Sequence, residues 1–245
     1  MEMEKAIKKS IEYVESKLCS DGGYSFYKHP YLEESNIYDT YYAIRTLIAL
    51  GKSVSNKTIL YIINSFLDAD TLEKYYYSIR CIELLKKDPK KYRARIELYF
   101  DISTKELEDI NLELLRMLMF KRISIYYDIE YSEEKIKKFI NSTDKSDIKT
   151  LSLIYAITGN LERDIEPYFH KHLGIVPTPN LKYTNTSTLY AGYWLLKLLN
   201  RELKYVLRAK EFVLMTQDKY GAFSETKEAL PDLRSNYCGI FILNL

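Results

Sequence analysis

The chain has 245 residues, which is long enough to bury a substantial core in one large domain or two small ones. Its 36 Lys and Arg residues nearly balance 34 Asp and Glu residues, and the net charge of +2 favours neither a nucleic acid nor an acidic partner. No apolar run reaches the length of a membrane span, and the charged start MEMEKAIKKS does not read as a signal peptide, so we expect a soluble cytoplasmic protein.

Two residue types stand out in the composition. Cys19, Cys81 and Cys238 lie far apart among apolar neighbours, which favours reduced, buried thiols over a disulfide framework. Tyrosine is frequent, with 24 Tyr against 9 Phe and 1 Trp. Because a tyrosine has an apolar ring and a hydroxyl that needs a partner, this excess suits the wall of an amphipathic cavity, and it equally suits a core in which Tyr replaces Phe.

Two kinds of helical segment alternate along the chain. Amphipathic segments begin near Glu4, Asn56, Pro89, Glu133, Asp164 and Glu202. Each is followed by a segment that is apolar nearly all round: DTYYAIRTL (39–47), KYYYSIRCI (74–82), NLELLRMLMF near 111, TLSLIYAITG at 150, STLYAGYWLL at 187 and SNYCGIFILNL at 235. The first two match at Tyr41/Tyr76, Tyr42/Tyr77, Ile44/Ile79 and Arg45/Arg80, a spacing of 35 residues, which indicates an internal repeat.

Local signals support the same division into helices. Asp88-Pro89 offers an N-cap followed by proline at the first helical position, and Ser103 to Glu106 read as a capping box. Strand alternation is almost absent. We therefore predict an all-α domain over 1–245, built from six helical hairpins with an outer amphipathic and an inner apolar helix each.

The two ends of the chain resemble each other, since DGGYSF (21–26) returns as DKYGAFS (218–224). An open stack of repeats needs different, polar caps at its two ends. The likeness therefore favours a closed ring in which the first and last units are neighbours.

These residues carry a resemblance to a known family. Gly22-Gly23-Tyr24-Ser25-Phe26 followed by Asp39-Thr40-Tyr41-Tyr42-Ala43, and Gly221-Ala222-Phe223 followed by Pro231-Asp232-Leu233 and Tyr237, are similar to the repeats of the prenyltransferase β-subunit and squalene cyclase superfamily. The resemblance spans essentially the whole chain. It implies an α/α toroid, with inner and outer helices around an apolar funnel.

The same resemblance implies that the zinc chemistry of protein prenyltransferases is absent. Aligned on Trp194, the positions of the family's three zinc ligands hold Thr188, Tyr190 and Ser235, and a phenol in place of a thiolate does not bind zinc at neutral pH. At the diphosphate site Lys182 stands for an arginine, whereas Asn185 and Ala191 replace a lysine and a tyrosine. We expect no metal and no cofactor.

Squalene-type cyclases use an Asp-x-Asp-Asp motif, and Asp68-Ala69-Asp70-Thr71 is one acid short of it. Asp68 and Asp70 are catalytic candidates, because two neighbouring carboxyl groups raise each other's pKa toward the range of a general acid. The alternative is helix capping by Asp70 or Thr71 beside a solvated Asp68.

The densest basic stretch runs from Lys86 to Arg95, at a hairpin turn and the start of an outer helix. We interpret it as a solvated face, because neither the net charge nor a recognised module supports contact with nucleic acid.

Two classes of function remain. In the first, a zinc-independent prenyltransferase-like or terpene cyclase-like toroid binds an isoprenoid or other lipid in a central aromatic cavity, with or without a transferase or cyclase reaction. The predicted ligand-binding residues are Tyr41, Tyr42, Arg45, Tyr76, Tyr77, Arg80, Lys182, Tyr190, Trp194 and Tyr237. In the second, the chain keeps the fold and is a catalytically inactive interaction protein that partners another helical protein. A separate alternative for the cavity is that these side chains fill the axis and leave no pocket.

Overall fold

The computed structural model describes residues 2–29, 31–92, 109–127 and 132–245, and these are mostly helical, as predicted. Ten α-helices lie in these ranges: α1 (Glu2–Ser16), α2 (Ile37–Ala49), α3 (Asn56–Leu67), α4 (Leu72–Leu84), α5 (Ile110–Ser124), α6 (Glu133–Ser142), α7 (Ile148–Thr158), α8 (Thr186–Leu198), α9 (Val206–Met215) and α10 (Leu233–Leu243). The described strands form two small antiparallel hairpins, β1 (Lys28–His29) with β2 (Leu32–Glu33) and β3 (Phe169–His170) with β4 (Gly174–Ile175).

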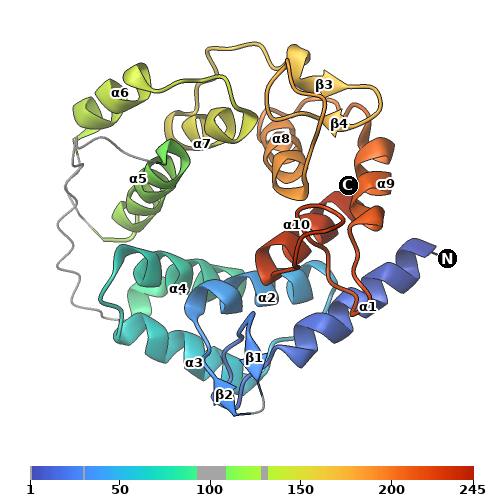
Figure 1. Ribbon diagram of the computed structural model, residues 1–245. Helices are drawn as coiled ribbons and strands as arrows, with labels where there is room; N and C mark the ends of the chain where they lie inside the picture. Colours follow the sequence, from blue (N-terminus) through green and yellow to red (C-terminus); the bar gives the residue numbers. More distant parts are fainter. Residues whose placement is uncertain (1, 30, 93–108, 128–131) are drawn as a thin grey trace.

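Six of the helices form a closed cycle (Figure 1). Helix α2 packs on α4, α4 on α5, α5 on α7, α7 on α8, α8 on α10, and α10 returns to α2. These six are the apolar segments predicted as inner helices. The first and last units are therefore neighbours, as the likeness between their sequences predicted.

Each of the six helices begins at a residue whose side chain accepts a hydrogen bond from a backbone N–H of the first turn. These N-caps are Asn36, Thr71, Asp109, Asp147, Asn185 and Asp232. An N-cap satisfies one of the donors that a helix start leaves free. Residues that stand the same number of positions after their N-caps are therefore equivalent in the six helices.

The six starts lie at one end of the ring. Glu225 accepts hydrogen bonds from Ser187 at the start of α8 and from Ser235 at the start of α10. The Thr150 hydroxyl of α7 donates to Asn111 of α5 across 2.9 Å. The inner helices are therefore parallel, and their C-terminal ends meet at the opposite end.

Four of the predicted outer helices are present as α1, α3, α6 and α9. Helix α1 packs on α2 and α10, α3 on α4, and α9 on α10, while Ile136 and Ile140 of α6 share a core cluster with residues of α5 and α7. At Pro89 the chain forms only a short 3-10 helix, η1 (Pro89–Lys91), with Asp88 as its N-cap. The predicted capping box Ser103 to Glu106 lies outside the described residues.

The outer helix predicted near Asp164 is wrong. The structure has a 3-10 helix there, η2 (Glu166–Tyr168), followed by the β3–β4 hairpin. Gly174 has φ +83°, and a Cβ on it would lie 3.2 Å from the Leu189 and Tyr193 side chains of α8. The hairpin is therefore pressed against the inner helix, and the Tyr168 hydroxyl anchors it by donating to the Ser146 carbonyl at 2.8 Å.

Equivalent glycine turns explain why the two ends of the sequence are alike. Gly22 has φ +98° and a Cβ on it would lie 2.6 Å from the Lys57 carbonyl oxygen of α3. Gly221 has φ +97° and a Cβ on it would lie 2.5 Å from the Lys9 carbonyl oxygen of α1. Each turn therefore packs on the outer helix of the next unit, and for the last unit the next unit is the first.

Side chains also join the last unit to the first. The Gln217 amide donates to the Ala6 carbonyl at 2.8 Å, and the Ser10 hydroxyl donates to Asn236 at 3.0 Å.

The three cysteines are free and buried, and burial raises the pKa of the Cys238 thiol to about 12. No helix in the part of the chain that the structure describes is long and apolar enough to cross a membrane.

Candidate functional site

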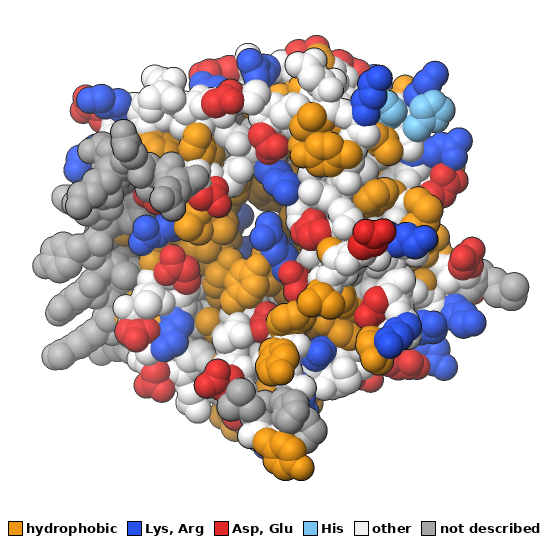
Figure 2. All heavy atoms as spheres, viewed as in Figure 1, with side chains coloured by type: hydrophobic (Ala, Val, Ile, Leu, Met, Phe, Trp, Pro, Cys, Tyr) orange, Lys and Arg blue, Asp and Glu red, His pale blue; other side chains and the backbone are white. Residues whose placement is uncertain are grey.

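A pocket of about 360 Å³ lies at the centre of the ring. Figure 2 shows the molecule hollowed near the middle of this face, with hydrophobic and charged side chains around the opening. Almost all lining residues stand two, five, six or nine positions after an N-cap, which is one face of a helix. They include Tyr38, Tyr41, Tyr42, Arg45, Tyr76, Tyr77, Arg80, Leu115, Leu118, Lys149, Leu153, Ala156, Tyr190, Trp194 and Arg234.

The two sides of the pocket differ in character. Helices α2, α4 and α8 contribute aromatic rings, with centroids 5.0 Å apart for Tyr41 and Tyr42 and 5.3 Å apart for Tyr41 and Tyr77. Tyr190 stacks nearly parallel on Trp194. Helices α5 and α7 contribute mainly aliphatic side chains. The pocket thus offers ring faces on one side and an aliphatic surface on the other.

Arg45 is held among aromatic rings. Its guanidinium carbon lies 3.9 Å from the ring centroid of Tyr237 and 5.2 Å from that of Tyr41, and Nη1 donates to the Tyr190 hydroxyl at 3.5 Å. Among the described residues it has no ion pair with an acid. Since a guanidinium stays charged, Arg45 is a fixed cation that the rings orient and no described carboxylate neutralises.

Other cations line the same pocket. Arg80 pairs with Glu83, which also accepts a hydrogen bond from the Tyr126 hydroxyl, and the buried Nε of Arg80 has no partner. Arg122, Lys149 and Arg234 complete the set. The only carboxylate among the described lining residues is Asp109, which caps α5. The wall is therefore positively charged.

Four of the pocket tyrosines, Tyr42, Tyr76, Tyr77 and Tyr190, are neutral phenols. Burial, followed by the nearby Tyr41 hydroxyl, raises the pKa of Tyr76 to about 12. Burial also raises the pKa values of Tyr42, Tyr77 and Tyr190 above their usual range. These hydroxyls therefore keep their protons and can donate hydrogen bonds to a ligand.

The structure brings together most of the predicted ligand-binding residues. Tyr41, Tyr42, Arg45, Tyr76, Tyr77, Arg80, Tyr190 and Trp194 line the central pocket. Tyr237 lies behind this wall, with its ring against Arg45 and its centroid 5.8 Å from that of Tyr190. Lys182 is exposed on the segment before α8 and does not line the pocket.

The two acidic candidates lie elsewhere. Asp68 is the exposed C-cap of α3, and the N-cap of α4 is Thr71. Exposed Asp70 accepts a hydrogen bond from Lys74 at 3.1 Å, and this lysine lowers the pKa of Asp70 instead of raising it. Neither carboxyl group lines the pocket. Asp68 and Asp70 thus lie between the end of α3 and the start of α4. This is the alternative of helix capping by Thr71 beside a solvated Asp68.

The positions that the resemblance assigned to zinc ligands are also separated. Tyr190 faces the pocket, Thr188 is fully buried, and the Ser235 hydroxyl donates to Glu225 at 3.3 Å. Within the described ranges, no group of three or more His, Cys, Asp and Glu side chains is placed to hold a metal ion.

Several lining residues were missed from the sequence. Tyr38, Lys149, Ser187 and Arg234 each stand two positions after an N-cap. In α2, α8 and α10 this position is one helical turn before a predicted tyrosine. The N-cap residues themselves were the signal that could have found them, because an alignment on the caps places these four side chains on the inner face.

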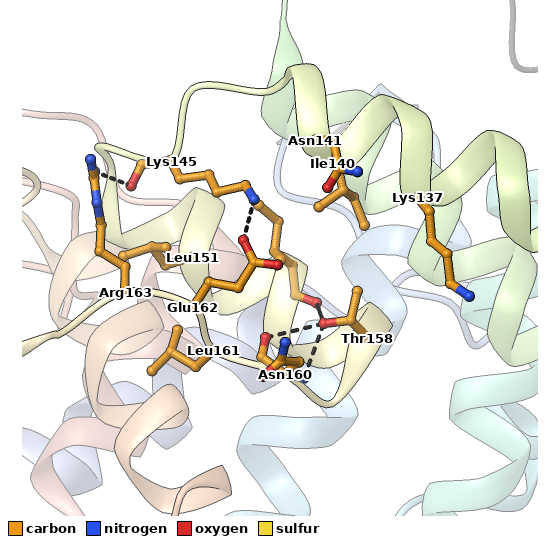
Figure 3. Close-up of a pocket in the computed structure, with 11 residues that line it drawn as sticks. Lys137, Ile140, Asn141, Lys145, Leu151, Thr158, Asn160, Leu161, Glu162 and Arg163 are labelled. Atoms are coloured by element: carbon orange, nitrogen blue, oxygen red, sulfur yellow. Dashed lines mark hydrogen bonds and ion pairs between the residues drawn. The ribbon is translucent and has the colours of Figure 1, made fainter.

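A second pocket of about 350 Å³ lies between α6, α7 and the segment after α7 (Figure 3). Each of its charged side chains has a partner, and Lys137 pairs with Glu133 outside the wall. Lys145 pairs with Glu162 at 2.6 Å, and Arg163 donates to the Lys145 carbonyl at 2.6 Å. The central pocket, with its unpaired Arg45, is therefore the stronger candidate.

Comparison with known proteins identified no relative of this chain. No protein-family model matches the chain, and neither a curated protein nor a solved structure matches it. The likeness to the prenyltransferase and squalene cyclase superfamily therefore stays a prediction from the residues quoted above.

Proposed function

We propose that the chain is an α/α toroid of helical hairpins, one of them altered, that binds an isoprenoid or other lipid-like ligand with an anionic head in its central pocket, without zinc. The observation that carries this proposal is Arg45, a cation without an acidic partner among the described residues, set in an aromatic wall. A partly buried cation of this kind is costly unless a ligand or its surroundings offset its charge.

The two sides of the pocket suit the two parts of such a ligand. A branched hydrocarbon chain contacts ring faces and aliphatic side chains without leaving polar groups unpaired. Its phosphate or carboxylate head accepts charge-assisted hydrogen bonds from Arg45 or Arg80 and from the neutral tyrosine hydroxyls. Asp109 is the only described carboxylate in the wall and is used as an N-cap, so the geometry supports binding more directly than a reaction.

Trp194 provides a direct test, since it is the only tryptophan and it lines the pocket. Farnesyl diphosphate is expected to change its fluorescence saturably and to raise the melting temperature of the protein. Farnesol and inorganic pyrophosphate, the two halves of this probe, are expected to bind more weakly because each leaves one side of the pocket unused.

Arg45→Met tests the head-group contact. A hydrogen bond to a charged group contributes about 1.5–3 kcal/mol, so the variant should bind farnesyl diphosphate roughly 10- to 100-fold more weakly while its affinity for farnesol stays within about twofold. Arg208→Met is the matched control, because Arg208 lies on outer helix α9 and pairs with Glu211. If neither farnesyl diphosphate nor farnesol changes the emission or the melting temperature, the ligand proposal fails and the interaction-protein alternative replaces it.

A further inference from the structure

The two ends of the ring carry opposite charge. The described segments at the C-terminal ends of four inner helices hold ten Lys or Arg and two Asp or Glu; they are residues 50–55, 85–92, 121–127 and 197–205. The described segments that precede the inner helices hold six Lys or Arg and twelve Asp or Glu; they are residues 17–29, 31–36, 68–71, 109, 143–147, 176–185 and 216–232. We name the first set the basic end. The whole chain has a net charge of only +2, so this charge is segregated in space.

The segments of the basic end meet in the structure. Arg122 and Leu198, in the last turns of α5 and α8, line the same pocket. Lys121 donates to the Ile157 carbonyl, which joins the ends of α5 and α7, and the Tyr127 hydroxyl donates to the Pro89 carbonyl at 3.4 Å. The cations therefore share one end of the molecule.

Helix dipoles do not account for all of this charge. A helix C-terminus carries about half a negative elementary charge, so six parallel helices attract about three cations. The excess of Lys and Arg over Asp and Glu at the basic end is larger than that. Lys86, Lys87, Lys90 and Lys91 are all exposed, and none has an ion pair among the described residues. A positive surface remains after the dipoles are offset.

Large apolar side chains are exposed between these cations. Ile125 is 62% exposed, Tyr205 45% and Leu198 43%. Leu198 and exposed Arg122 also belong to the wall of the central pocket, so the pocket reaches the basic end. Cations around protruding apolar side chains fit the interface of an anionic bilayer, where headgroups neutralise the cations and the apolar side chains enter the boundary of the acyl region. A nucleic acid would leave the aliphatic side chains in water.

We infer that the basic end docks on the surface of a bilayer that contains anionic phospholipids. Docking in this orientation places the pocket wall at Arg122 and Leu198 next to the lipid. The inference does not depend on what the pocket binds, because the four exposed lysines between Lys86 and Lys91 lie outside the pocket.

Co-sedimentation with vesicles tests the inference. The full chain is expected to sediment with phosphatidylcholine vesicles in which about a third of the lipid is phosphatidylglycerol, and not with phosphatidylcholine alone. Because each cation near an anionic surface contributes roughly a fivefold change in partitioning, replacing Lys86, Lys87, Lys90 and Lys91 together by Gln should weaken binding by at least tenfold. Raising the salt concentration several-fold should weaken it as well.

A matched variant separates position from net charge. Lys28, Lys182, Lys219 and Lys227 are exposed on segments that precede inner helices, and replacing these four by Gln removes the same charge at the opposite end of the ring. This control should bind vesicles like the unmodified chain. Equal loss in both four-lysine variants, absence of vesicle binding, or binding of a single-stranded oligonucleotide in place of vesicles would overturn the inference.

Discussion

The tyrosines around the pocket link ionisation to stability. The pKa of Tyr76 is about 12 in the folded protein and about 10 in an unfolded chain, because burial disfavours the phenolate. The folded state therefore holds this proton more tightly. The contribution to stability is complete below pH 10 and is lost as the pH rises from 10 to 12.

Tyr76→Phe isolates this effect. The free energy of unfolding of the unmodified chain, measured by urea titration, should fall between pH 9.5 and 11.5, and the variant should fall less steeply over the same range. Two pKa units correspond to a difference on the order of 2–3 kcal/mol for one tyrosine over its whole titration, and roughly two thirds of it falls within this range. Parallel curves for the two proteins would show that Tyr76 ionises as easily in the fold as in the unfolded chain.

At the scale of an element, the glycine turns determine how one unit packs on the next. Gly221→Ala should cost more stability than its backbone strain alone, because the new Cβ would lie 2.5 Å from the Lys9 carbonyl oxygen. The control is Gly51→Ala. Gly51 also has positive φ, at +71°, but a Cβ there meets no atom within 4 Å.

Gly51→Ala should lower the free energy of unfolding by about 1–2 kcal/mol, the cost of the left-handed conformation. Gly221→Ala should lower it by at least about 2 kcal/mol more, since the turn must move away from α1. Equal destabilisation of the two variants in urea titration would mean that the turn of the last unit does not rest on the first outer helix.

The segment near Asp164 shows the limit of reading elements from a periodic pattern. Its apolar residues predicted an outer helix, yet Tyr168 is buried and the chain turns back as the β3–β4 hairpin. Leu189 and Tyr193 of α8 meet this hairpin at Gly174. Because Leu189 and Tyr193 belong to another helix, the sequence around Asp164 alone could not predict their contact with the hairpin.

At the scale of the molecule, the closed cycle makes the last helix necessary for both of its neighbours. Deleting residues 218–245 removes α10 from α2 and from α8. It also removes buried side chains such as Phe223, Tyr237, Ile240 and Leu243, each contributing about 1.5–3 kcal/mol. This sum exceeds the stability of a typical domain.

The fragment 1–217 should therefore show no cooperative thermal transition in circular dichroism. A chain that lacks only residues 1–4 is the control, since residues 2–4 are exposed at the start of α1, and its melting temperature should stay within a few degrees of the full chain. A monomeric 1–217 fragment that melts cooperatively would mean that the units are stable without closure.

The sequence alone determined the helical class, the alternation of amphipathic and apolar helices and the likeness of the two ends, because periodicity and capping act over a few neighbouring residues. It also placed Tyr41 and Tyr76, and Arg45 and Arg80, at equivalent positions. Only the tertiary structure decided that these equivalents differ. Arg80 pairs with Glu83, whereas Arg45 lies among Tyr190 and Tyr237 from the far end of the chain.

The same distinction applies to the site as a whole. The repeat predicted which face of each helix turns inward, but whether those side chains fill the axis or leave a pocket depends on distances across the ring. The segregation of charge between the two ends likewise appears only once the six inner helices are seen to run parallel, because a balanced sequence contains no information about which segments gather in space.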